Sequence, residues 1–246
     1  MSVSPRPGGR VPGQGVTMHP VEGGRWLVTV SGTRGGEPSR SAGDFETFAR
    51  RLRHPLVADL IAGAEPLTDV LLSRSTINRR RYFERLDRWP GGFVVIGDAV
   101  AAYNPIYGHG MSVAALNAAA LRDTLAGQVL GDPRLARRAQ RAVARTADAA
   151  WSMAVGEDIH YPGAIGERPP VPARLLRGYV QRMMLTGTVD PAVTRPLLDV
   201  MTLSKPMAGL FAPGVVLRVL RGPLGRPPTE PPITAAERAV AGLTPR

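Results

Sequence analysis

The chain of 246 residues contains no cysteine, which excludes a disulfide framework, a thiolate catalyst and a cysteine metal site. Its four histidines do not show the spacing of metal ligands, so the sequence predicts no zinc or iron site. No apolar stretch reaches the length of a membrane span, and residues 1–16 lack the apolar core of a signal peptide. We therefore expect a soluble, cytoplasmic protein with no membrane partner.

Lysine is nearly absent as well. Lys205 is the only one, so arginine carries almost all of the positive charge behind the formal net charge of +11. The densest arginine clusters, at residues 79–81 and 134–145, are not interleaved with aromatic side chains and belong to no recognisable nucleic-acid-binding fold. A bias in composition, with a solvated helix face at residues 134–145, explains this pattern better. We expect no nucleic-acid partner.

Residues 91–126 form the stretch around which the rest of the sequence is organised. They open with four apolar residues, Phe93 to Ile96, a run that is typical of a strand buried on both faces. Gly97 and Asp98 follow, then a loop with one proline and two glycines, and then a segment dense in alanine and leucine. The sequence therefore predicts a strand, an acidic turn, a glycine loop and a helix.

The predicted helix has an apolar side that alanines would allow to pack closely against a sheet. That side consists of Met111, Ala114, Ala115, Ala118, Leu121 and Leu125.

A unit of this kind can bind a ligand, because strand ends of α/β sheets open into crevices. The Asp98 carboxylate can accept hydrogen bonds from a sugar or polyol hydroxyl, and Gly108 and Gly110 let a ligand approach the backbone. The free N–H groups of a helix that starts near Met111 favour an anionic or electron-rich oxygen. The same pattern also joins strands to helices in proteins that bind nothing there. The residues alone leave both interpretations open.

Three segments carry a family resemblance: Gly97-Asp98-Ala99, Asn104-Pro105 and the run from Gly108 to Ser112. Together they resemble the second flavin-binding motif of the FAD-dependent aromatic hydroxylases and flavin halogenases. In that family the motif's Asp holds the ribityl chain. The proline-glycine loop and the next helix N-terminus face the pyrimidine edge of the flavin ring, where negative charge develops on reduction. The resemblance implies that Asp98 is the ribityl ligand.

The cofactor-binding residues that the resemblance implies are Gly97, Asp98, Asn104, Pro105, Gly108, His109, Gly110 and Met111. The family often has a His soon after Gly-Asp-Ala, whereas Val100 and Ala101 stand here, which points to a less characterised branch. Because chemistry in this family comes mostly from reduced flavin and oxygen, no protein acid or base is assigned. The catalytic residues stay unknown.

The resemblance implies an α/β protein with an incomplete FAD/NAD(P)-binding fold of the glutathione-reductase type, part of a β substrate domain and a helical C-terminal region. We expect a disordered leader over residues 1–20, a partial oxidoreductase domain over 21–221 and a proline-rich tail without a stable fold over 222–246. Within that domain, the flavin-loop unit takes residues 91–126 and the helical region residues 132–221.

Local patterns predict further elements. Residues 25–30 alternate as a strand does, and residues 45–62 repeat at helical spacing with a break at Pro55. Residues 68–74 indicate another strand, and Asp190-Pro191 indicates the capped start of a helix. Residues 79–82 either lie near the active-site crevice, as the resemblance implies, or form a surface connection with a buried aromatic residue.

A complete flavin hydroxylase also needs a strand, a Gly-x-Gly-x-x-Gly turn and a helix to hold the ADP half of FAD. Gly13-Gln14-Gly15 comes nearest, but no apolar strand precedes it, and no third glycine or helix follows. We therefore expect the C-terminal half of a flavoenzyme, from a truncated or split chain.

Two functions are consistent with these expectations. The first is an FAD-dependent monooxygenase or other oxidoreductase that acts on an unidentified hydrophobic or aromatic small molecule, with NADH or NADPH as the reductant. The second is a non-catalytic remnant or binding module of the same fold, paired with a partner chain that supplies the ADP-binding half.

Overall fold

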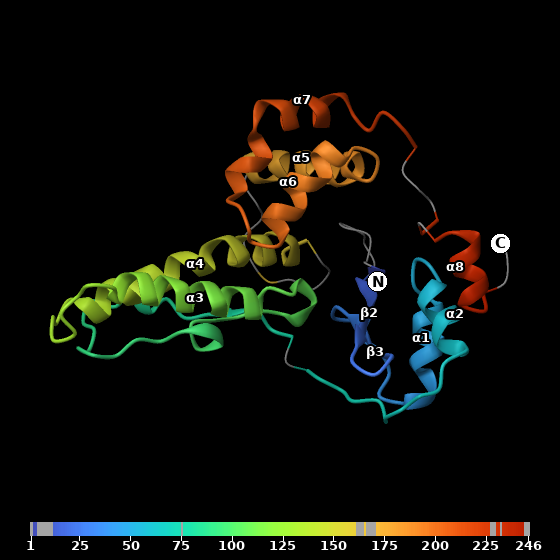
Figure 1. The fold of residues 1–246 in the computed structure, drawn as a ribbon, viewed down its shortest axis with the longest axis horizontal. Helices are drawn as coiled ribbons and strands as arrows, with labels where there is room; N and C mark the ends of the chain where they lie inside the picture. The colour runs from blue at the N-terminus through green and yellow to red at the C-terminus, as the bar shows by residue number, and fades with distance from the viewer. Residues whose placement is uncertain are drawn as a thin grey trace. The chain divides into compact units, whose positions relative to one another are not determined.

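The computed structural model of the chain describes residues 2–3, 12–74, 76–160, 165, 171–226, 230–231 and 233–243. These residues belong to two compact units (Figure 1). Residues 1–74, 157–166 and 231–246 make up the first unit, and residues 75–156 and 167–230 make up the second. Each unit combines helices with a small antiparallel sheet, so the chain is a mixed α and β protein.

The sheet of the first unit has the strand order β1–β2–β3. Its strands are β1 (Ser2–Val3), β2 (Gln14–Val21) and β3 (Arg25–Gly32). β2 and β3 form a hairpin in which Val16 lies opposite Val30. The strand predicted at residues 25–30 is confirmed by β3.

The disordered leader predicted over residues 1–20 is wrong for the part that forms β2. Val16 and Met18, two residues apart in β2, point to the same side of the sheet and are buried against Phe48, Leu52 and Val57. This burial of apolar side chains stabilises the strand, although the proline and glycine content of the segment is typical of disorder. Residues 1 and 4–11 of the predicted leader lie outside the described residues.

Among the described residues, the first unit also contains the helices α1 (Phe45–Arg50), α2 (Leu56–Ala62) and α8 (Ala235–Val240). The predicted break at Pro55 is confirmed, since α1 ends before it and α2 begins after it. The strand predicted at residues 68–74 is wrong, because the segment has no pairing partner in the described chain and Leu71 is 91% exposed.

The proline-rich tail predicted to lack a stable fold contains α8. The Thr234 hydroxyl accepts a hydrogen bond from Glu237 N at 3.2 Å, and Glu237 Oε2 accepts one from Thr234 N at 2.8 Å. This reciprocal capping box satisfies two backbone N–H groups at the start of the helix. The tail prediction is therefore wrong at residues 235–240.

Figure 1 shows the α-helices of the second unit in its described part. They are α3 (Gly110–Leu125), α4 (Leu135–Asp158, whose last two residues belong to the first unit), α5 (Val171–Gly187), α6 (Pro191–Met201) and α7 (Pro213–Arg221). Figure 1 shows α3 and α4 running antiparallel side by side. Asn117 of α3 joins them by donating a hydrogen bond to Thr146 Oγ1 of α4 at 2.6 Å. The predicted cap of α6 is confirmed, since Asp190 Oδ1 accepts a hydrogen bond from Ala192 N.

Two apolar clusters hold the second unit together. One lies between α3, α4 and the segment around β5 (Ala101–Ala102), and it includes Val100, Tyr103, Val113, Val143 and Ala147. The other joins α5, α6 and α7 through Met183, Val193, Val200, Leu210 and Val219. β5 pairs antiparallel with β4 (Arg79–Arg80). In the described ranges, every helix is too short or too polar to serve as a membrane span.

The buried strand predicted at residues 93–96 is not formed. The segment is extended but pairs with no strand of the described chain, and Phe93 and Ile96 are 53% and 44% exposed. The apolar side predicted to pack in α3 is also wrong at three of its residues. Met111, Ala115 and Ala118 are exposed, while Val113 and Asn117 are buried. The wrong strand and the wrong packing side have one cause. Among the described residues, no sheet covers the exposed side chains of residues 93–96 and of α3.

Candidate functional site

The extended segment at residues 93–96 is held by side-chain amides instead of a neighbouring strand. Val95 N donates a hydrogen bond to Gln140 Oε1 of α4 at 2.8 Å, and Gly97 N donates one to Asn117 Oδ1 of α3 at 2.8 Å. Gln140 and Asn117 are 1% and 0% exposed. The two amides thus fix the approach of the chain to the acidic turn.

The turn itself depends on Gly97, whose φ of +61° is a backbone conformation that residues with a Cβ rarely adopt. It begins a short 3₁₀ helix, η3 (Gly97–Ala99), and leaves Asp98 exposed. Asp98 lies beside the start of α3, because a Cβ built on Gly110 would stand 3.9 Å from Asp98 Oδ1. The structure therefore brings together the carboxylate and the glycine that the resemblance singles out.

The loop between the turn and α3 is ordered by its own hydrogen bonds. Asn104 Oδ1 accepts a hydrogen bond from Ile106 N at 3.2 Å, and Asn104 N donates one to Asn78 Oδ1 at 2.7 Å. Pro105 begins the 3₁₀ helix η4 (Pro105–Tyr107), and Gly108 ends it with a φ of +66°. Asn104, Pro105 and Gly108 thus shape the loop that leads into α3.

The other two residues from the motif point in different directions. His109 is 8% exposed, its Nε2 lies 3.0 Å from the carbonyl oxygen of Met201, and its ring stacks on Tyr107 with centroids 6.3 Å apart. It therefore fastens the loop to the end of α6. Met111 is 87% exposed and is in the first turn of α3.

Asp98 lines an open hollow of about 600 Å³. The other lining residues are Arg79, Arg81, Phe83, Phe93, Val95 and Ala99. The lining is mostly apolar around one carboxylate and two guanidinium groups. Arg81 is tied to this place because its backbone N–H donates to Val100 O at 2.8 Å and its side chain donates to Ala99 O at 3.2 Å.

Sequence reasoning left residues 79–82, and with them Arg79 and Arg81, between the active-site crevice and a surface connection. The structure places both arginines on the hollow that Asp98 lines. The signal in the sequence was their separation by two, since alternate residues of an extended segment face the same side. In the described part of the chain, no group of three or more histidine, aspartate or glutamate side chains is arranged to hold a metal ion.

A search against protein-family models finds no match for the chain. The chain is similar to Protein Rv3254 of Mycobacterium tuberculosis (strain ATCC 25618 / H37Rv), with 32% identity over 159 residues. The match covers 63% of this chain and 33% of that relative. The chain thus spans about a third of the length of the relative it matches, whose name states no activity.

Proposed function

We propose that the chain provides the flavin-side half of an FAD-dependent oxidoreductase of the hydroxylase type, which acts on a hydrophobic or aromatic small molecule. The observation that carries this proposal is the closeness of the Asp98 carboxylate to Gly110, at the start of α3 and on the rim of a mostly apolar hollow. The FAD/NAD(P)-binding fold is part of the proposal.

The residues at the hollow suit a flavin in three respects. Asp98 is exposed and can accept hydrogen bonds from ribityl hydroxyls. Gly110 has no side chain to block the start of α3, whose N–H groups favour negative charge on a ring oxygen. Phe83 and Phe93 supply aromatic surface on the same hollow.

Each part of the site has a definite task. Bound flavin would supply the redox chemistry, with NADH or NADPH as the source of electrons. Asp98 would orient the cofactor by its ribityl chain, and Gly110 would let the ring approach the backbone. Arg79 and Arg81 would offset the negative charge of Asp98 and of any anionic group in the hollow.

A second function is favoured by exposed apolar side chains in residues 93–96 and in the first turn of α3. Phe93, Ile96 and Met111 are 53%, 44% and 87% exposed, and side chains of this size are usually covered when they cluster. In this alternative the chain is a non-catalytic module that binds a partner chain through these residues. The partner would carry the ADP-binding half of the fold.

The test is a titration of the chain with FAD, monitored by flavin fluorescence and the visible flavin bands. We expect saturable binding that Asp98→Ala weakens by tenfold or more, since a hydrogen bond to a charged group contributes about 1.5–3 kcal/mol. Asp87→Ala is the matched control, because Asp87 is exposed and has no partner among the described residues.

The two functions differ in the events after binding. Reduction of the bound flavin by NADH or NADPH, with consumption of oxygen, supports the oxidoreductase. Flavin binding that appears only after a separate ADP-binding chain is added supports the module. Binding that is equal in the Asp98→Ala variant and the parent chain removes Asp98 from the site.

A further inference from the structure

The segment from Arg79 to Glu84 separates two hollows. Its odd-numbered residues, Arg79, Arg81 and Phe83, line the hollow of Asp98, whereas its even-numbered residues line a second one. For Arg79 and Arg80 this alternation follows from their position in strand β4, whereas Phe83 and Glu84 belong to a short 3₁₀ helix, η2 (Phe83–Arg85). The second hollow has a volume of about 520 Å³, within the range of small-molecule sites.

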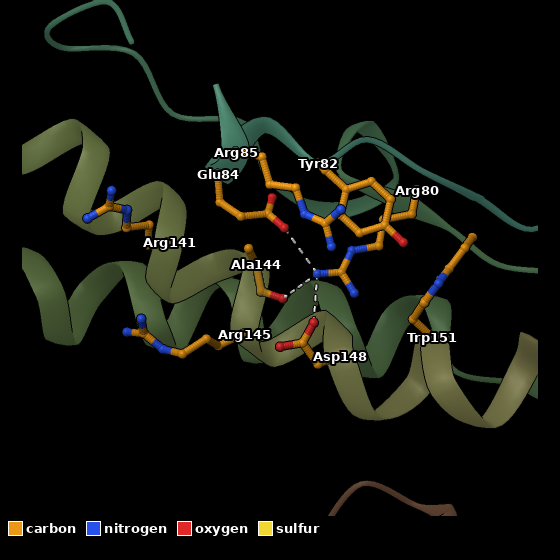
Figure 2. A pocket seen from close by; sticks show the side chains of 9 residues that line it. All are labelled: Arg80, Tyr82, Glu84, Arg85, Arg141, Ala144, Arg145, Asp148 and Trp151. Carbon is orange, nitrogen blue, oxygen red and sulfur yellow. Dashed lines mark hydrogen bonds and ion pairs between the residues drawn. The ribbon is translucent and has the colours of Figure 1, made fainter. Parts of the chain in front are cut away.

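One face of α4 forms the opposite wall of the second hollow (Figure 2). The residues of that wall are Arg141, Ala144, Arg145, Asp148 and Trp151. They recur every three or four positions, so they lie on one side of the helix. The remaining lining residues are Arg80, Tyr82, Glu84 and Arg85.

Arg80 lies in this hollow and forms ion pairs with both of its carboxylates, so its single positive charge offsets one of their two negative charges. Its side chain is 6% exposed, and Nη2 lies 2.7 Å from Asp148 Oδ1 and 3.3 Å from Glu84 Oε1 (Figure 2). Although burial lowers the pKa of Arg80, its hydrogen bond and ion pair with Asp148 raise that pKa overall. Arg80 Nε and Glu84 Oε2 are buried without a hydrogen-bond partner among the described residues.

The other three arginines add three positive charges, and the remaining carboxylate charge balances only one of them. The Arg85 guanidinium lies over the Tyr82 ring, 4.0 Å from its centroid. Arg141 and Arg145 stand four residues apart on α4, where like charges repel. With four arginines against two carboxylates, the lining has an excess of two positive charges.

The arginines of α4 differ in their partners. Arg137 donates to Leu86 O, and Arg138 donates to Gln128 and pairs with Asp132. Arg141 and Arg145, which line the hollow, have no ion-pair or hydrogen-bond partner among the described residues. Figure 2 shows both side chains extending from α4 on the same side.

Trp151 supplies a flat surface at the other end of the same helix face. Its ring packs edge-on against the buried Tyr103, with centroids 6.4 Å apart and planes at 61°, so its position is fixed. A fixed, half-buried indole in a hollow is suited to stacking on a planar heterocycle.

We propose that this second hollow binds a ligand of the nucleotide class, with its phosphate groups on Arg141 and Arg145 and its planar ring against Trp151. Guanidinium groups recognise phosphate oxygens by paired charged hydrogen bonds. The phosphate groups would place negative charge beside Arg141 and Arg145 and so offset the repulsion between these two arginines. This site is distinct from the hollow of Asp98, because the chain from Arg79 to Glu84 divides them.

The test is isothermal titration of the whole chain with ADP, pyrophosphate and adenosine. We expect ADP to bind most tightly, pyrophosphate more weakly and adenosine weakest. The double variant Arg141→Gln/Arg145→Gln should weaken ADP binding by about tenfold or more, because it removes charged hydrogen bonds. The matched control is Arg134→Gln/Arg195→Gln, which makes the same change in charge at two side chains without partners among the described residues.

The outcomes are separable from those of the flavin experiment. Asp98→Ala should leave ADP affinity unchanged, since Asp98 lines the other hollow. Absence of saturable ADP binding, or equal loss in the control variant, would overturn the site. Adenosine binding as tightly as ADP would overturn the role of the arginines, and pyrophosphate binding as tightly as ADP would overturn that of Trp151.

Discussion

Gln140 holds Val95 as a neighbouring strand would: its side-chain Oε1 accepts a hydrogen bond from Val95 N at 2.8 Å. The bond links α4 to a segment that has the sequence of a strand but pairs with none in the described chain. The segment leads directly into Gly97 and Asp98. The position of the candidate carboxylate therefore depends on an amide 45 residues further along the chain.

The first prediction concerns this bond. Gln140→Leu keeps the volume of the side chain but leaves Val95 N without its acceptor, so we expect the free energy of unfolding to fall by about 1–3 kcal/mol. Urea denaturation measures this loss, and amide hydrogen exchange at Val95 should become faster. Gln181→Leu in α5 is the control, because Gln181 has no side-chain hydrogen-bond partner among the described residues. Equal losses in the two variants would show that the bond is not the cause.

The second prediction compares two glycines of the loop. Gly108→Ala forces a Cβ onto a residue with φ of +66°, so we expect a loss of about 1–2 kcal/mol in the free energy of unfolding. Gly110→Ala places its Cβ 3.9 Å from Asp98 Oδ1, which is ordinary van der Waals contact, so stability should be kept. Thermal unfolding of both variants measures the difference.

The Gly110→Ala variant also tests the proposed flavin site. If the ring approaches the start of α3, Gly110→Ala should weaken FAD binding by about tenfold, equivalent to about 1.4 kcal/mol. A fluorescence titration of this stable variant gives the answer. Unchanged FAD affinity in Gly110→Ala would place the ring elsewhere.

The third prediction concerns alkaline pH. Tyr103 is 8% exposed, its hydroxyl donates to Ala147 O at 3.1 Å, and burial raises its pKa to about 12. The folded state holds this proton more tightly than the unfolded chain. The contribution of protonated Tyr103 to the free energy of unfolding is therefore complete below the ordinary tyrosine pKa of about 10. It is lost as the pH rises from about 10 to about 12.

Tyr103→Phe should therefore lower the free energy of unfolding at pH near 8 by about 1 kcal/mol, the contribution of one hydrogen bond. It should also remove part of the loss of stability above the ordinary tyrosine pKa. Denaturation curves at several alkaline pH values, with absorbance of the tyrosinate ion, measure both effects. An identical pH dependence in the variant and the parent chain would contradict the prediction.

Helix positions were largely predictable because their signals are local. Asp190-Pro191 starts α6 through a side chain two residues from the backbone group that it caps, and Pro55 separates α1 from α2 by removing a backbone donor. Strands were less predictable because they need a partner. β2 pairs and is buried, whereas residues 93–96 remain single in the described chain.

The candidate site was predictable in its order along the chain but not in its orientation. The motif from Gly97 to Met111 implied that Asp98 and Gly110 lie together, and a short turn and loop make that closeness a local matter. Whether His109 turned inward depended on the carbonyl of Met201, which lies 92 residues away. No pattern near His109 could reveal that partner.

By itself, the sequence determined the mixed composition, the absence of cysteine chemistry and the start of several helices, since each depends on residue types or on neighbours a few positions apart. Tertiary structure alone decided which apolar runs found a partner, and that Arg79 and Arg80 face different hollows. The reason is physical: burial and strand pairing need surfaces from distant parts of the chain, whereas a cap or a turn is completed within a few residues.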